Sequence, residues 1–124
     1  MQNKSLDDYL KEANELVPRL SFEETIDFIK NKETVIIDVR EDSEVINYGL
    51  IKEAIHIPRG LIEFKLSPNS PNNPVEIKEN TNILVYCAGG YRSALAGKTL
   101  IELGFPNVFN LSLIHISEPT RRST

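Results

Sequence analysis

The sequence predicts an α/β domain in which a parallel sheet is covered by helices on both faces. Two short apolar runs, at residues 34–37 and 82–86, are continuous rather than alternating, which is typical of strands buried on both faces. Segments with apolar residues at helical spacing lie around these runs, and such alternation favours parallel strands joined by helices. The chain has 124 residues, the size of one domain, so we expect a single core.

Two helices are expected at the start of the chain. Apolar residues recur at helical spacing over residues 5–16, and Pro18 would end that helix. Ser21 and Glu24 form the pattern of a capping box, in which the hydroxyl and the carboxylate satisfy free backbone amides. The second helix should therefore begin after Ser21 and run to about Lys32.

The middle of the chain is expected to hold short elements and one loop. The strand at 34–37 is followed by a second short strand at 54–57, which ends before Pro58. Residues 60–66 are typical of a brief helix. The segment 67–74 contains three prolines among turn-forming residues, so it should be a surface loop.

The clearest strand pattern, at 82–86, should lead through a loop into a long helix. That helix is expected over residues 93–103, because Gly104 suits a left-handed backbone at a helix end and Pro106 cannot continue the helix. Residues 108–111 are typical of a last strand.

The composition is that of a globular protein and excludes several classes. Hydrophobic residues make up 40% of the chain and charged residues 26%, with a formal net charge of −4. The acidic balance and the scattered Lys and Arg argue against nucleic acid as a partner. The chain begins with polar residues and has no apolar stretch of signal-peptide or membrane-spanning length, so we expect a cytoplasmic protein without a membrane partner.

Cys87 is the single cysteine of the chain, and this narrows its chemistry. One cysteine cannot form an internal disulfide, and with two histidines it offers no zinc spacing, so neither a metal nor another cofactor is expected. The residue is either a small buried side chain or a reactive thiol.

The loop after Cys87 favours the reactive thiol. In open α/β sheets ligands bind beyond the carboxyl ends of the strands, where this cysteine is expected to lie. Gly89 and Gly90 allow the loop to curl with its N–H groups inward, and the helix start at Ser93 adds the positive end of a dipole. Arg92 supplies a permanent positive charge. These features favour the thiolate, which is the nucleophilic form, and would equally hold a persulfide anion.

Three motifs together resemble those of one family. Residues 87–94, Cys-Ala-Gly-Gly-Tyr-Arg-Ser-Ala, are similar to the C-x-x-G-x-R-S active loop of the rhodanese-like sulfurtransferases. Residues 38–41, Asp-Val-Arg-Glu, and the pair Ile57-Pro58 are similar to two further motifs of that family. The chain resembles the single-domain type over residues 5 to about 111.

The resemblance implies a fold and a mechanism. The fold would be rhodanese-like, with a parallel five-stranded sheet between helices and Arg19-Leu20 as its short first strand. The Cys87 thiolate would attack the sulfane sulfur of a small anionic donor such as thiosulfate, and sulfite would leave. The outer sulfur of the Cys87 persulfide would then pass to a thiol or cyanide acceptor, and a protein could serve as donor or acceptor.

The resemblance also implies roles for the residues around the cysteine. Loop amides would stabilise the charged forms of Cys87, while Arg92 would attract the anionic donor and Tyr91 could shape access. The anion-binding loop would consist of Ala88, Gly89, Gly90, Tyr91, Arg92 and Ser93.

Three more residues near these motifs are candidates for supporting or binding roles. Asp38 and Arg40 would support the loop and the sheet, and a structural ion pair or turn contact is an equally open interpretation. Arg59 could reach the donor at the mouth of the site, or it could be a solvated side chain. His56 is expected to be a packed strand residue rather than a base.

Two other functions compete with sulfur transfer from small donors. Phosphatases and arsenate reductases of related fold place five residues between cysteine and arginine, whereas this chain places four between Cys87 and Arg92. A sulfur-carrier or protein-interaction module would take sulfur from a partner and turn over small donors poorly. The sequence does not separate this second alternative from a free-standing enzyme.

The end of the chain departs from the family pattern. Residues 111–121 resemble the translation of a transposon adapter used in sequencing libraries, so we expect a rhodanese-like domain over 1–111 and a non-native tail over 112–124. The family's closing helix would then be missing, and the chain would be less stable than a complete homologue. A second departure is the segment 49–54, which replaces the family's G-H-I-P-G-A and could shape its turn differently.

Overall fold

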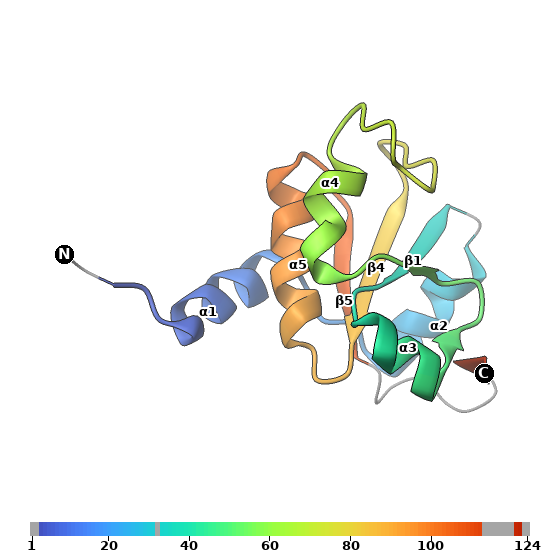
Figure 1. Cartoon of the computed structure of the whole chain (residues 1–124), viewed down its shortest axis with the longest axis horizontal. Helices are drawn as coiled ribbons and strands as arrows, with labels where there is room; N and C mark the ends of the chain where they lie inside the picture. The colour runs from blue at the N-terminus through green and yellow to red at the C-terminus, as the bar shows by residue number, and fades with distance from the viewer. Residues whose placement is uncertain (1–2, 32, 113–120, 123–124) are drawn as a thin grey trace.

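The computed structural model describes residues 3–31, 33–112 and 121–122 of the chain. Helices lie on both sides of a central sheet (Figure 1). The helices are α1 (Leu6–Leu16), α2 (Phe22–Lys30), α3 (Asp42–Tyr48), α4 (Ile62–Leu66) and α5 (Tyr91–Glu102), with a 3-10 turn over Arg59–Leu61 before α4. The strands are β1 (Thr34–Asp38), β2 (Leu50–Ile51), β3 (Ile55–His56), β4 (Asn82–Cys87), β5 (Val108–Ser112) and β6 (Arg121–Arg122).

Within the described residues, the central sheet has four parallel strands in the order β3-β1-β4-β5, and β2 pairs separately with β6. The register sets Asp38 of β1 beside Tyr86 of β4, and Cys87 beside Ser112 of β5. The carboxyl ends of β1, β4 and β5 therefore lie at the same end of the sheet. This arrangement confirms the predicted parallel α/β class.

The expected fifth strand is the main difference in the sheet. Arg19 forms only a single parallel bridge with Asn110 of β5. The preceding Pro18 has no N–H to donate, and Ser21 already serves as the N-cap of α2, so the segment between them is too short for a ladder. The sheet thus has four strands in the described residues instead of five.

Alternate strand residues enter two apolar clusters, one on each face of the sheet. One cluster joins side chains of β1 and β4 to those of α4 and α5, and includes Ile37, Val85, Cys87, Ile62 and Leu100. The other joins the intervening strand residues to α2, and includes Ile36, Leu84, Tyr86, Leu111 and Phe28. Burial on both faces explains why the strand sequences are continuously apolar.

The predicted helices and loop are largely confirmed. In α2, the Glu24 N–H donates to Ser21 Oγ at 3.1 Å and the Ser21 N–H donates to Glu24 Oε1 at 2.9 Å, as the capping box requires. The helix ends at Lys30, two residues before the expected end. Residues 67–74 form turns without a helix or strand, as expected.

Two elements differ from the expectation in ways that matter for the site. Helix α3 was not predicted; it begins after Glu41, whose N–H donates to Glu44 Oε1 at 3.0 Å. Helix α5 begins at Tyr91 rather than at Ser93, because Gly90 takes φ +88° and forms its N-cap. Arg92 and Ser93 therefore belong to the first turn of α5.

The expected tail, residues 112–124, falls mostly outside the described residues. Ser112 ends β5, and Arg121 and Arg122 form β6. The rest of the segment lies outside the described ranges, and the described residues test neither the boundary after residue 111 nor the absence of the closing helix. The boundary stays a prediction.

Candidate active site

Cys87 is the last residue of β4 and is 1% exposed. The Gly90 N–H donates to its Sγ at 3.1 Å and the Ser93 N–H at 3.4 Å, and Ser93 Oγ lies 3.4 Å from the same sulfur. Ala88 and Gly89 are exposed at the surface of the loop. The loop therefore curls around the sulfur with its N–H groups inward, as the two glycines predicted.

The surroundings of Cys87 act on its ionisation in opposite directions. Burial raises the pKa of the thiol, because a charged sulfur loses water. A hydrogen bond from the Ser93 hydroxyl to the sulfur would favour the thiolate most, followed by bonds from the N–H groups of Ser93, Gly90 and Arg92, and together these would lower the pKa below the ordinary value. A thiol of lowered pKa is a better source of the nucleophilic thiolate.

Gly90 shapes the loop through its left-handed backbone. A Cβ at this position would lie 2.1 Å from Nη2 of Arg19, whose guanidinium covers the glycine. Its φ of +88° is a conformation that other residues resist. Arg19 thus adds a positive charge beside the loop. From the sequence, Arg19 was expected only as part of a short first strand.

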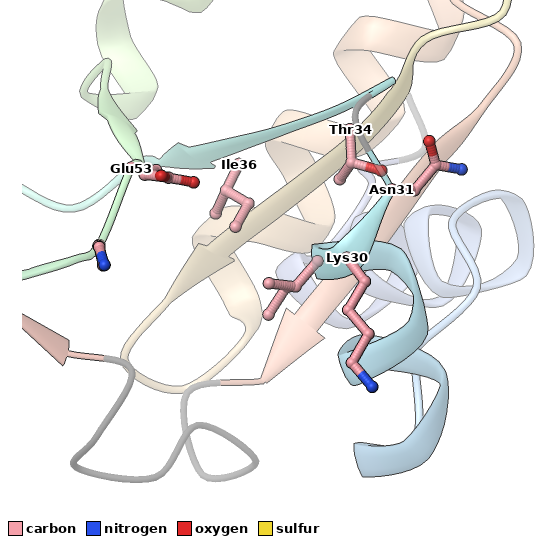
Figure 2. A pocket seen from close by; sticks show the side chains of 7 residues that line it. Lys30, Asn31, Thr34, Ile36 and Glu53 are labelled. Atoms are coloured by element: carbon pink, nitrogen blue, oxygen red, sulfur yellow. The ribbon is translucent and has the colours of Figure 1, made fainter.

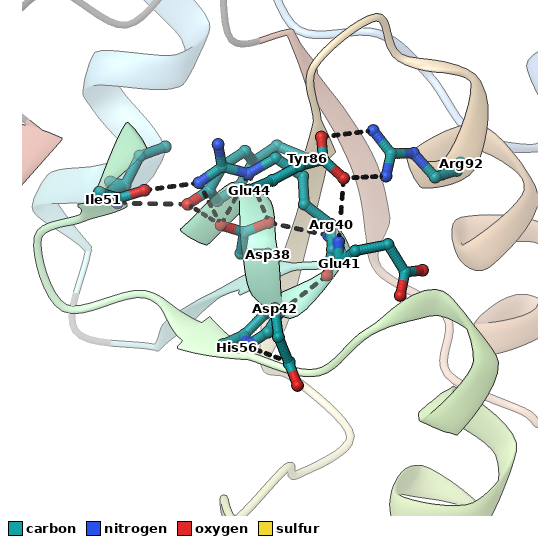
Figure 3. Close-up of polar contacts among 10 residues, drawn as sticks. Asp38, Arg40, Glu41, Asp42, Glu44, Ile51, His56, Tyr86 and Arg92 are labelled. Carbon is teal, nitrogen blue, oxygen red and sulfur yellow. Dashed lines mark hydrogen bonds and ion pairs between the residues drawn. The ribbon is translucent and has the colours of Figure 1, made fainter. Parts of the chain in front are cut away.

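The Arg92 side chain makes a bidentate ion pair with Glu44 of α3 (Figure 3). Its Nη2 donates to Glu44 Oε2 at 2.9 Å, and its Nη1 donates to Oε1. Hydrogen bonding to Arg92 lowers the pKa of Glu44 to about 2, and in return raises the pKa of Arg92. The structure therefore gives Arg92 an internal partner that the sequence analysis did not foresee.

Asp38 and Arg40 form a buried ion pair at the carboxyl end of β1 (Figure 3). Arg40 Nη2 donates to Asp38 Oδ2 at 2.7 Å and to the Gly49 carbonyl at 2.6 Å. The Tyr86 hydroxyl donates to Asp38 Oδ2 at 2.8 Å and accepts the Ile51 N–H at 3.2 Å. Burial raises the pKa of Tyr86, so its hydroxyl stays a donor. This geometry fits a supporting role.

The side chains of Arg59 and His56 form hydrogen bonds with residues other than Cys87. The Arg59 guanidinium donates to Glu63 Oε1 at 3.2 Å and to Thr99 Oγ1 of α5 at 3.0 Å. His56 Nε2 lies 2.7 Å from the Arg40 carbonyl oxygen. Neither contact brings its side chain to the sulfur, and a donor-binding role for Arg59 stays a prediction.

Asn110 is a site residue that the sequence analysis missed. It lies in β5, beside β4, and is 1% exposed. Its Oδ1 accepts the Ser93 hydroxyl at 2.6 Å, and its Nδ2 donates to the Gly90 carbonyl at 3.2 Å. The only available signal was its expected place in the last strand, next to the cysteine strand of a parallel sheet.

Comparison with known proteins decides the family. Residues 21–113 match the family model described as Rhodanese-like domain. The chain belongs to the rhodanese-like family. The match covers the helices α2 to α5 and all four strands of the central sheet, and the resemblance read from the motifs is thereby confirmed.

Relatives of this rhodanese-like chain have several described activities. It is 36% identical to a tRNA uridine(34) hydroxylase of Prochlorococcus marinus over 67% of this chain and 27% of that protein. It is also 36% identical to a putative mitochondrial thiosulfate sulfurtransferase of Schizosaccharomyces pombe, over 64% and 59%. A putative sulfur carrier protein of Bacillus subtilis is 31% identical over 77% and 47%. The chain thus spans from about a quarter to about three fifths of the length of these relatives.

One solved structure is similar to this chain over most of its length. A protein of unknown function from Rhodopseudomonas palustris, described as a possible tyrosine phosphatase, superposes with a TM-score of 0.79. The two chains are 32% identical, and the match covers 90% of this chain and 86% of the other.

A surface hollow elsewhere on the rhodanese-like domain does not include the cysteine. It has a volume of about 270 Å³ and lies around the start of β1 (Figure 2). Because β1 and β4 are parallel and in register from Thr34 and Asn82, this hollow lies at the opposite end of the sheet from Cys87. Its lining residues are Ile29, Lys30, Asn31, Thr34, Ile36, Lys52 and Glu53.

The described residues hold neither a metal-binding cluster nor a membrane-spanning helix. No group of three His, Cys, Asp or Glu side chains among them could hold a metal ion. No helix among them is long and apolar enough to cross a membrane.

Proposed function

We propose that this rhodanese-like chain transfers sulfane sulfur from a donor such as thiosulfate to a thiol or cyanide acceptor through a persulfide on Cys87. The observation that carries the proposal is the sulfur at the carboxyl end of β4, with the Gly90 and Ser93 N–H groups directed at it. Such a nest stabilises a negative charge on sulfur in both the thiolate and the persulfide.

The first half-reaction loads the enzyme. The Cys87 thiolate attacks the sulfane sulfur of thiosulfate, forming a new S–S bond. The bond between that sulfur and the sulfonate group breaks, and sulfite leaves with the electron pair. The outer sulfur of Cys87 now carries the negative charge, and no proton or external oxidant is needed.

The second half-reaction regenerates the thiolate. Cyanide or an acceptor thiolate attacks the outer sulfur, and the S–S bond to Cys87 breaks with its electron pair on the cysteine sulfur. The products are thiocyanate or a new persulfide, respectively. The loop amides hold the charge in each state, while the Asp38–Arg40 pair keeps the strand ends in place.

A discharge assay and a mass measurement test the proposal. Thiosulfate should add about 32 Da to the intact protein, the mass of one sulfur, and cyanide should remove it. Cys87→Ala should abolish both the adduct and thiocyanate formation, while Lys11→Ala, at an exposed position of α1, should keep them. Thiocyanate formation that survives in Cys87→Ala would refute the mechanism.

A sulfur-carrier role is the second candidate, favoured by the likeness to the putative sulfur carrier protein of Bacillus subtilis. In this case sulfur would come from a protein persulfide rather than from thiosulfate. The adduct would then form with a cysteine desulfurase and cysteine, and not with thiosulfate alone. Hydrolysis of an aryl phosphate that depends on Cys87 would instead support a phosphatase, the function suggested for the Rhodopseudomonas palustris protein.

A further inference from the structure

The hydrogen bonds around Ser93 fix where its single hydroxyl proton lies. Asn110 Nδ2 lies 3.2 Å from the Gly90 carbonyl, which only accepts hydrogen bonds, so the amide nitrogen must face this carbonyl. Asn110 Oδ1 therefore faces Ser93 Oγ at 2.6 Å, and Oδ1 also only accepts. The Ser93 hydroxyl must donate to Asn110.

The same hydroxyl cannot donate to the sulfur at the same time. Ser93 Oγ lies 3.4 Å from Cys87 Sγ, and its one proton is already directed at Asn110. In the thiol state the S–H group can donate to Ser93 Oγ. In the thiolate state the sulfur is an acceptor, and it keeps the N–H groups of Gly90 and Ser93.

Turning the hydroxyl towards the sulfur would be costly in this environment. Ser93 is 0% exposed and Asn110 is 1% exposed, so water does not replace the lost bond at Asn110 Oδ1. A buried acceptor without a partner is strongly disfavoured. The hydroxyl therefore stays on Asn110 when the cysteine ionises.

We propose that Asn110 is a positioning residue for Cys87: it holds the Ser93 hydroxyl away from the sulfur and anchors the Gly90 peptide, so that backbone N–H groups hold the thiolate and the persulfide. The proposal rests on the proposed function for its catalytic meaning, but its geometry and its test concern only the ionisation of Cys87. A thiolate with fewer hydrogen bonds stays more basic and is intrinsically the stronger nucleophile.

Charged groups from the other packed elements face this loop and must stay constant in any test. They are Arg92 of α5 with its partner Glu44 of α3, and Arg19 over Gly90, while the pair of Asp38 and Arg40 lies at the end of β1 on the Tyr86 side of the sheet. Substitutions at Ser93 and Asn110 change none of these charges, so a difference in ionisation reports on the hydrogen bonds.

The test is the pKa of Cys87, measured from thiolate absorbance and from the pH dependence of alkylation. In Ser93→Ala the pKa should stay equal or fall, because the variant removes an acceptor for the thiol and no donor for the thiolate. A rise of about one pH unit, which the loss of one hydrogen bond to the thiolate would cause, would overturn the proposal. Cys87→Ala supplies the blank for both measurements.

A double-mutant cycle tests the part played by Asn110. In Asn110→Leu the freed Ser93 hydroxyl can donate to the sulfur. This substitution should therefore lower the pKa of Cys87 by about one pH unit more in the wild-type background than in the Ser93→Ala background. An equal change in both backgrounds would refute the coupling. The Ser93→Ala result decides the proposal by itself if Asn110→Leu does not fold. Loss of sulfur transfer with these pKa results intact would count against the proposed function alone.

Discussion

Replacing Arg40 by methionine removes one half of a buried ion pair and leaves the other half in place. The Arg40 side chain is 4% exposed, and the Asp38 side chain is 0% exposed. Asp38 would lose the three side-chain hydrogen bonds that Arg40 Nε and Nη2 donate to its two oxygens. The Gly49 carbonyl would lose its bond to Arg40 as well.

The expected loss of unfolding free energy is about 3–5 kcal/mol, the usual cost of leaving one buried charge without its partner. This is a large part of the about 5–15 kcal/mol that stabilises a typical domain. The backbone N–H of Arg40, at 2.9 Å from Asp38 Oδ1, and the Tyr86 hydroxyl remain, which argues for the lower half of the range. Urea unfolding followed by circular dichroism measures the change.

The same substitution at Arg59 serves as the control. Its side chain is 28% exposed and it pairs with Glu63, a partner that is 55% exposed. Because water screens such a pair, Arg59→Met should cost less than about 1 kcal/mol. A loss below about 1 kcal/mol in Arg40→Met, or equal losses in both variants, would show that the Asp38–Arg40 pair does not support the fold as we argue.

Three further substitutions probe the elements around the loop. Glu44 has a pKa of about 2, below its ordinary 4.5, so its pairing with Arg92 contributes stability above pH 4.5 that is lost as the pH falls towards 2. In Glu44→Gln the urea midpoint should therefore fall less between pH 6 and pH 3 than it does in the wild type. Because the pair is partly exposed, we expect the unfolding free energy to change by only about 1 kcal/mol. Gly90→Ala, at φ +88°, should cost about 1–2 kcal/mol in unfolding and slow thiocyanate formation; wild-type rates would contradict the role of this turn. In Gly97→Ala the new Cβ would lie 2.9 Å from a Val17 methyl, so about 1–2 kcal/mol should be lost in thermal unfolding, and this loss should disappear when Gly97→Ala is made in a Val17→Ala background.

The strands and long helices could be predicted because the pattern of apolar residues in the sequence matches the side chains that the fold buries. The segment at 82–86 is apolar on both faces, and the structure packs it between two clusters. Helix α3 could not be predicted by the same rule, because none of its residues is buried. Ile46 and Tyr48 of this helix are 68% and 67% exposed, so no apolar stripe marks it in the sequence. Its one local signal was the pair Glu41 and Glu44 at the N-terminus.

The site divides in the same way between local and distant contacts. The cysteine loop could be predicted because Cys87, Gly90 and Ser93 are close in sequence and the backbone N–H groups of the last two donate to the sulfur. Glu44 and Asn110 reach the loop only through the fold. A sequence without its fold does not say that a carboxylate meets Arg92, and so the arginine was assigned only to the Cys87 thiolate and the anionic donor.

Tyr86 explains how a network on one face of the sheet can support chemistry on the other. Consecutive strand residues point to opposite faces of the sheet. Tyr86 therefore lies in the cluster that includes residues of α2, while Cys87 lies in the cluster that includes residues of α5. The Tyr86 hydroxyl bonds Asp38 and Ile51, and its carbonyl accepts the Val39 N–H at 3.0 Å. Both its side chain and its backbone are therefore fixed immediately before the cysteine. We therefore propose that Asp38 and Arg40 support the sulfur through the end of β4, so that their loss should disturb the loop by freeing that strand end rather than by removing a group from the reaction.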